Sequence, residues 1–168
     1  MLRFIALPLV LLATSALHAQ PGEPPIYSAP LQPLSPSKRG VVFKSKLARD
    51  FGRQCSRASP TGYWTSVAPS KNEIKQLEAA LPRFVAQTKT ARRSGKLSDF
   101  LFQYGALERG GKRLIYVNAF PDDKFSSRDR QVWRRGAMVV CDGGPSFWGA
   151  EWDTKTKAFQ NMSFNGPY

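Results

Sequence analysis

The sequence has 168 residues, of which 42% are hydrophobic, and its 25 lysine and arginine side chains outnumber 12 acidic ones, for a formal net charge of +13. This length is enough for one domain, and the single histidine, His18, lies near the amino terminus. If the first 19 residues are removed, no imidazole remains, which excludes Ser-His-Asp triads, Cys-His pairs and zinc sites that contain histidine.

Residues 1–19 have the three parts of a secretory signal peptide. Arg3 supplies the positive start, residues 4–12 form an apolar run, and small residues precede a cleavage position after Ala19. The run is shorter than the ~20 residues that span a bilayer, and no later stretch is apolar enough. We therefore expect a periplasmic or secreted protein without a transmembrane segment after signal removal. Its charge becomes +12, because Arg3 leaves.

Six prolines lie between residues 20 and 36. Proline lacks a backbone N–H and fixes φ, so a segment this rich in proline forms neither helix nor sheet. We predict a Pro-rich disordered tether over residues 20–40 and a single domain over residues 41–168.

The first element of that domain is predicted to be an amphipathic helix over residues 41–57. At helical spacing, four basic side chains share one side of it: Lys46, Arg49, Arg53 and Arg57. They are candidates for contact with an anionic surface or polymer. The alternative is a helix that lies on a sheet with its basic side in water.

A second helix is predicted over residues 70–88. Ser70 followed by Glu73 makes a capping box, and an apolar stripe runs from Ile74 to Val85. Pro82 removes one backbone donor, so we expect it to kink or split the helix after Ala80.

From residue 98 the hydrophobic period changes to 2, which is typical of strands. The expected strands are 100–104, 114–120, 138–141, 147–153 and 158–164, with the first two joined by a hairpin turn at residues 108–111. Helices followed by strands predict an α+β fold. The expected architecture is one or two N-terminal helices packed on a four- to five-stranded antiparallel meander, cystatin-like or NTF2-like in outline.

Cys55 and Cys141 are the two cysteines. Export exposes them to an oxidising compartment, where an even count indicates a bridge. The long loop that the bridge closes predicts a stabilisation of ~4–5 kcal/mol. The alternative is two separately buried thiols.

The segment that follows Cys141 is the densest candidate for a binding site. Asp142 precedes a Gly143-Gly144 turn, and Trp148 and Trp152 share one face of the following strand. This Trp-bearing face beside a glycine turn could bind a sugar or a protein partner. The alternative is that both tryptophans fill the core under the helix, with the opposite face of the strand more solvated.

Paired carboxylates are the remaining route to catalysis. Glu151 and Asp153 lie two apart, so they point to one face of a strand, and such a pair could hydrolyse a glycoside. The alternative is a solvated strand face. Asp122 and Asp123 lack the spacing of an EF-hand, so we expect no metal and no cofactor.

The motifs Val-Cys-Asp-Gly-Gly at 140–144, Phe-Trp-Gly at 147–149 and Ser-Phe-Asn-Gly at 163–166 resemble the ending of small exported bacterial proteins of unassigned function. The resemblance covers roughly residues 60–166. It implies a bacterial, periplasmic or secreted setting and carries no catalytic residues over.

The leading hypothesis is a non-enzymatic exported binding or accessory protein of the bacterial envelope. Its partner would be an unknown protein or an anionic envelope polymer, and no motif indicates specific nucleic-acid binding. A carboxylate-dependent envelope hydrolase and a cationic binder of anionic polymers or membrane surfaces are the alternatives.

Overall fold

A computed structural model describes residues 35–93, 95–124 and 129–166, which form an α+β domain around a mixed sheet of six strands. The predicted signal peptide and residues 20–34 of the predicted tether lie outside the described residues. Residues 35–40, which we expected in the tether, pack on the sheet. Ser35 is buried, and its backbone N–H donates to the Gly40 carbonyl oxygen at 2.8 Å.

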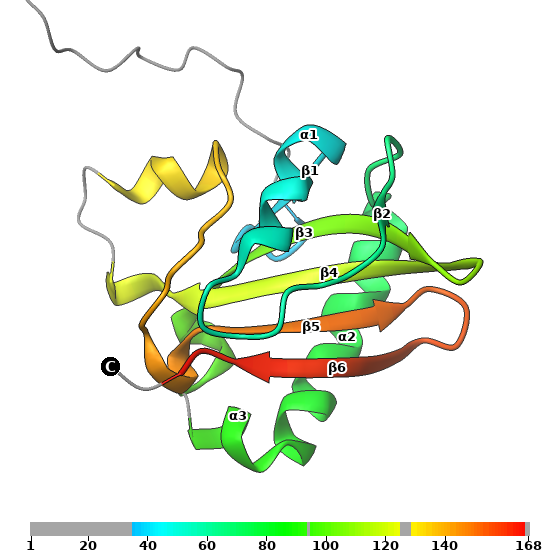
Figure 1. Ribbon diagram of the computed structural model, residues 1–168. Coiled ribbons are helices and arrows are strands. Elements are labelled where there is room, and N and C mark those ends of the chain that lie inside the picture. Colours follow the sequence, from blue (N-terminus) through cyan, green and yellow to red (C-terminus); the bar gives the residue numbers. More distant parts are fainter. Residues whose placement is uncertain (1–34, 94, 125–128, 167–168) are drawn as a thin grey trace, which may run out of the picture.

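The sheet has the order β1-β3-β4-β5-β6, and the two-residue strand β2 pairs with β3 (Figure 1). The strands are β1 (Gly40–Phe43), β2 (Tyr63–Trp64), β3 (Phe100–Arg109), β4 (Lys112–Pro121), β5 (Trp148–Asp153) and β6 (Ala158–Phe164). The predicted hairpin is present between β3 and β4. Gly110 and Gly111 form its turn at φ of 57° and 71°, which glycine adopts without steric cost.

β1 runs parallel to β3, so the sheet is mixed and not wholly antiparallel as expected. Parallel neighbours need a long crossover connection. Here that crossover contains α2 (Lys71–Gln87), which lies against one face of the sheet (Figure 1). Because α2 returns the chain to the end of the sheet where β1 starts, β3 enters in the same direction as β1.

The helix predicted over residues 41–57 is wrong over most of its length. β1 occupies its start, and only the short helix α1 (Ser45–Ala48) and the 3-10 helix η1 (Arg49–Arg53) follow. Val41 and Phe43 are fully buried while Val42 is half-buried. That alternation has the strand period of 2, which the helical pattern of the basic residues masked.

The strand predicted over residues 138–141 is also wrong, because β5 occupies the place beside β4. Residues 138–141 have no regular structure, and side chains of the sheet hold this segment instead. The Met138 N–H donates to Gln103 Oε1 at 2.8 Å, and Asn118 Nδ2 donates to the Met138 carbonyl oxygen at 2.9 Å.

The helix predicted over residues 70–88 is confirmed as α2, and its capping box is present. The Glu73 N–H donates to the Ser70 hydroxyl at 3.2 Å, and the Ser70 N–H donates to the Glu73 carboxylate at 2.7 Å. α2 continues through Pro82 without the predicted split. Pro82 is exposed, so its ring lies on the solvent side of the helix and does not disturb the packed stripe.

The remaining helices are short. They are α3 (Lys89–Arg93), η2 (Leu97–Asp99), η3 (Asp122–Lys124), η4 (Asp129–Arg134) and η5 (Gly144–Ser146).

Ser70→Ala is expected to lower the free energy of unfolding by about 1 kcal/mol, because the Glu73 N–H loses its acceptor. Urea denaturation measures the change. Asn72→Ala is the matched control, since Asn72 is an exposed residue of the same turn and should shift stability by less than ~0.5 kcal/mol. Equal effects of the two substitutions would show that the cap contributes nothing specific.

The sheet buries side chains on both faces. On the α2 face, Trp148 and Trp152 are 1% and 0% exposed and pack in one cluster with Ile74 and Leu77. On the opposite face, Phe51 of η1, Trp64 and Tyr116 form a second cluster. The expected solvated face of β5 is therefore buried, with Glu151 and Asp153 only 2% and 5% exposed.

Candidate functional site

Buried polar side chains lie on the face of the sheet opposite α2. Gln103 of β3, Asn118 of β4 and Glu151 of β5 are each at most 2% exposed. The chain between η1 and β2 crosses in front of this face (Figure 1). Burial of a polar group is costly unless it is hydrogen-bonded, so the partners of these three side chains define the site.

One network of amide side chains holds a distant segment, residues 136–140, over the sheet. Asn118 Nδ2 donates to Gln103 Oε1 at 2.9 Å, and Gln103 Nε2 donates to the Gly136 carbonyl oxygen at 2.8 Å. Asn165 Nδ2 donates to the Val140 carbonyl oxygen at 2.6 Å. The amide side chains thus fasten residues 136–140 and the carboxyl-terminal residues over the sheet.

Arg57 completes this network. Its Nη1 donates to Asn165 Oδ1 at 3.0 Å, and its Nη2 donates to Asn118 Oδ1. Its Nε is buried and has no hydrogen-bond partner. Burial lowers the pKa of the guanidinium, although nearby Tyr116 opposes that shift. Both hydrogen-bond acceptors are neutral amides, so among the described residues no carboxylate pairs with Arg57.

Tyr116 lies beside Arg57 at the centre of the face. The residue is 2% exposed, and its hydroxyl makes no hydrogen bond of good geometry. Burial raises the pKa of the Tyr116 hydroxyl, while Arg57 acts in the opposite direction. The hydroxyl therefore stays protonated at neutral pH and can donate. Gly149 of β5 lies directly beneath it, and a Cβ there would collide with the tyrosine ring.

A cavity of about 320 Å³ opens next to Tyr116. Its walls come from the segment before β2, from β5 and from β6. The lining residues are Ala58, Ser59, Pro60, Thr61, Arg109, Tyr116, Glu151, Asn161, Met162 and Ser163. We call this cavity the Tyr116 pocket.

An ion pair forms one side of the Tyr116 pocket. Arg109 binds Glu151 through both guanidinium ends, with Nη1 to Oε1 at 2.8 Å and a second contact between Nη2 and Oε2. Asn161 Nδ2 also donates to Glu151 Oε2 at 2.7 Å. The Glu151 side chain is 3% exposed, and its hydrogen bond raises the pKa of Arg109. Both side-chain oxygens of Glu151 thus accept hydrogen bonds from donors of this chain.

The disulfide between Cys55 and Cys141 is confirmed, with the two Cα atoms 4.9 Å apart. Both cysteines are exposed, so the expected alternative of separately buried thiols does not hold. The bridge joins the segment that carries Arg57 to the segment that Gln103 and Asn118 fasten down. The disulfide therefore links these two segments covalently at the exposed side of the site.

The predicted binding residues after Cys141 do not form one surface. Trp148 and Trp152 are in the core under α2, so the alternative interpretation of this pair holds and no ligand on the surface reaches it. Asp142 is exposed, and Gly143 and Gly144 are buried. Gly144, at φ of 60°, donates its N–H to the Gly166 carbonyl oxygen at 3.0 Å.

The four basic residues expected on one arc are divided. Lys46, Arg49 and Arg53 are exposed along α1 and η1, whereas Arg57 turns into the network. The helical spacing ends at Gln54, whose backbone is extended at φ −61° and ψ 135°. Arg57 therefore does not share a face with the other three.

The two carboxylates expected to share a strand face do so, but each is already bound. Asp153 accepts the backbone N–H groups of Lys155 at 2.8 Å and Thr156 at 3.0 Å, and these bonds lower its pKa. Glu151 is bound by Arg109. Among the residues that the structure describes, no three histidine, cysteine or acidic residues come together to hold a metal, and no helix has the length and apolar character to cross a membrane.

Tyr116, Arg109 and the inward turn of Arg57 were not predicted from the sequence. One signal was available: Gln103 and Asn118 are amides inside otherwise apolar strands, and buried amides need partners. No protein-family model, curated protein or solved structure matches this chain.

Proposed function

We propose that this chain is a non-enzymatic exported binding protein of the bacterial envelope, and that the Tyr116 pocket receives an anionic group of its ligand. The observation that carries the proposal is the half-buried Arg57 guanidinium, whose Nε is buried without a hydrogen-bond partner and whose acceptors are the neutral amides Asn118 and Asn165. A charge that is partly withdrawn from water and has no opposite charge beside it destabilises the folded state. An anion beside Arg57 would offset that destabilisation.

The unused donors indicate where the anion binds. Arg57 Nε and the Tyr116 hydroxyl are both buried and make no well-directed hydrogen bond, although the two side chains lie close enough to influence one another. The oxygens of a carboxylate or a phosphate accept from such a pair, and hydrogen bonds to charged groups are stronger than those between neutral groups. Tyr116 lines the pocket and Arg57 directly precedes the lining residue Ala58, so we place the anion at this end of the pocket.

The state of the carboxylates supports binding over catalysis. A general acid or base needs a pKa near the working pH. Asp153 has a lowered pKa, and the side-chain oxygens of Glu151 accept hydrogen bonds from Arg109 and Asn161. These groups suit the carboxylate-dependent hydrolase poorly, so that alternative ranks below a binding protein.

Tyr116→Phe is expected to weaken the binding of inorganic phosphate or acetate about tenfold, because it removes one hydrogen bond to a charged group. Isothermal titration with each anion measures the affinity and distinguishes the phosphate and carboxylate chemistries. Tyr63→Phe is the matched control, since Tyr63 is 70% exposed and lies outside the pocket. Unchanged affinity in Tyr116→Phe contradicts the proposal.

A second candidate function rests on the three exposed basic residues of α1 and η1. Lys46, Arg49 and Arg53 could bind an anionic polymer or a membrane surface, and salt would weaken that binding because exposed charges are screened within ~10 Å at 0.1 M. We also propose that the fold is cystatin-like or NTF2-like in outline. It is supported by one long helix laid on a sheet.

A further inference from the structure

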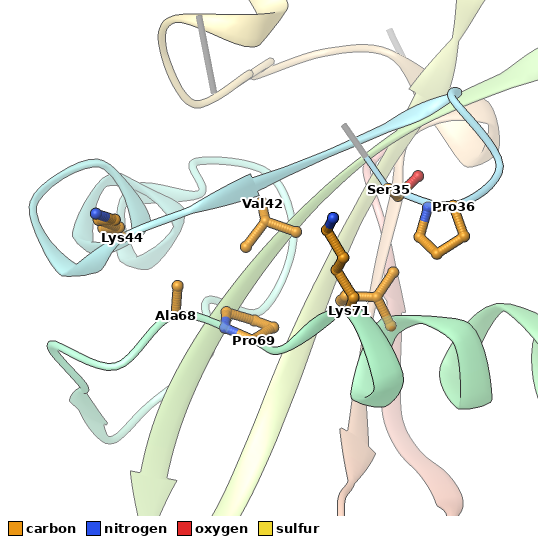
Figure 2. A pocket seen from close by; sticks show the side chains of 8 residues that line it. Ser35, Pro36, Val42, Lys44, Ala68, Pro69 and Lys71 are labelled. Atoms are coloured by element: carbon orange, nitrogen blue, oxygen red, sulfur yellow. The ribbon is translucent and has the colours of Figure 1, made fainter. Parts of the chain in front are cut away.

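A second cavity, of about 180 Å³, lies at the free edge of the sheet between β1 and the start of α2. Figure 2 shows Val42 of β1 and Lys71 of α2 pointing toward one another across it. Pro69 and Ile74 supply further apolar wall. The cavity does not share a residue with the Tyr116 pocket, so its role is independent of the function proposed above.

β1 has one open side. It pairs with β3 on one edge and with no other strand among the described residues. The Phe102 N–H donates to the Arg39 carbonyl oxygen, whereas the Gly40 carbonyl oxygen points the other way and accepts from Ser35. In a parallel ladder the direction alternates along the strand. The N–H and C=O of Val42 therefore face outward, as those of Gly40 do.

The side chain and backbone of Val42 thus offer two kinds of contact at one place. Its side chain packs toward the α2 face and lines the cavity. Its backbone presents a donor and an acceptor at the sheet edge. A strand added at this edge would pair with Val42 and direct alternate side chains toward the α2 face.

The rim of the cavity is positive. Lys44 and Lys71 are both exposed, and both line it. The nearby acidic residues of α2 are already bound. Glu73 pairs with Arg113 at 2.8 Å, and Glu78 accepts from the Ser37 hydroxyl at 2.8 Å. Neither lysine forms an ion pair with another residue in the described part of the chain, so acidic side chains of a partner can pair with both.

We propose that the free edge of β1 binds an extended acidic peptide segment of a partner protein by strand addition. The peptide's backbone pairs with the N–H and C=O of Val42, one of its small apolar side chains enters the cavity, and its acidic side chains lie near Lys44 and Lys71. Main-chain hydrogen bonds supply affinity in this mode of recognition, while the pocket and the lysines supply specificity.

The test uses the exported protein and two labelled peptides, one of alternating glutamate and valine and one of alternating lysine and valine. The acidic peptide is expected to bind and to shift the Val42 amide resonance, and the basic peptide is not. Lys71→Glu should weaken the acidic peptide roughly fivefold. Lys75→Glu is the matched control, because Lys75 is also exposed on α2 and the charge change is identical, but it does not line the cavity.

Val42→Pro provides a second variant. Proline is tolerated on an edge strand where its missing N–H faces outward, so this variant should fold and bind the acidic peptide roughly fivefold more weakly. Equal binding of both peptides, or equal effects of Lys71→Glu and Lys75→Glu, overturns the proposal. Slow hydrogen exchange of the Val42 amide in the free protein also overturns it, because the edge would then already be occupied.

Discussion

Replacing both cysteines in Cys55→Ser/Cys141→Ser is expected to lower the free energy of unfolding by about 4–5 kcal/mol. The bridge joins residues 86 apart in the sequence, and the chain-entropy model assigns a large stabilisation to a loop of that length. The effect extends to the site. Without the bridge, the segment that carries Arg57 is no longer tied to residues 136–141, which Gln103 and Asn118 hold on the sheet.

Urea denaturation of the double variant and of the oxidised protein measures this difference. Treatment of the parent protein with a reductant serves as the control, because it opens the same bridge without changing any side chain. It should reproduce the variant's loss of stability. A loss below ~1 kcal/mol would show that the network holds both segments without the disulfide.

Arg109→Leu is expected to lower the free energy of unfolding by about 3 kcal/mol, because it leaves the Glu151 carboxylate, 3% exposed, without its cation. Arg53→Leu is the matched control. Arg53 pairs with Asp50 at 3.4 Å, but its side chain is 80% exposed, and exposed pairs contribute ~0–1 kcal/mol.

The variant Arg109→Leu/Glu151→Leu separates the cost of an unpaired charge from the loss of contacts. Removal of both charges should restore part of the stability lost in Arg109→Leu, since no buried charge then remains. Chemical denaturation of the three variants decides the matter. If the double variant is less stable than Arg109→Leu, the ion pair is not what holds Glu151 in the folded state.

Local signals predicted α2 well, because a capping box and an apolar stripe lie within the helix itself. β1 could not be predicted in the same way. Its parallel pairing with β3 depends on where α2 places the chain. The hydrophobic period of 2 is visible over only four residues and competes with a helical pattern of charges that continues beyond them.

The site depends on similar long-range contacts. Arg57 looked like a surface residue because the helical spacing was extended past Gln54, where the helix ends. Glu151 looked solvated because its neighbours come from distant parts of the chain: Arg109, which binds it, lies 42 residues earlier, and Pro60, which lines the same pocket, lies about ninety residues earlier. The disulfide was predictable because it rests on the cysteine count and on the expectation of export, which need no knowledge of packing.

The most direct measurement is a titration of the disulfide-bonded protein with inorganic phosphate, in which the arginine Nε–H resonances are followed by two-dimensional ¹H–¹⁵N NMR. If Arg57 and Tyr116 bind an anion, the Arg57 Nε–H resonance shifts with a saturable dependence on phosphate, while those of the exposed Arg49 and Arg53 move little and without saturation. An Arg57 resonance that stays fixed, or that moves in proportion to the exposed arginines, contradicts a binding site at the Tyr116 pocket.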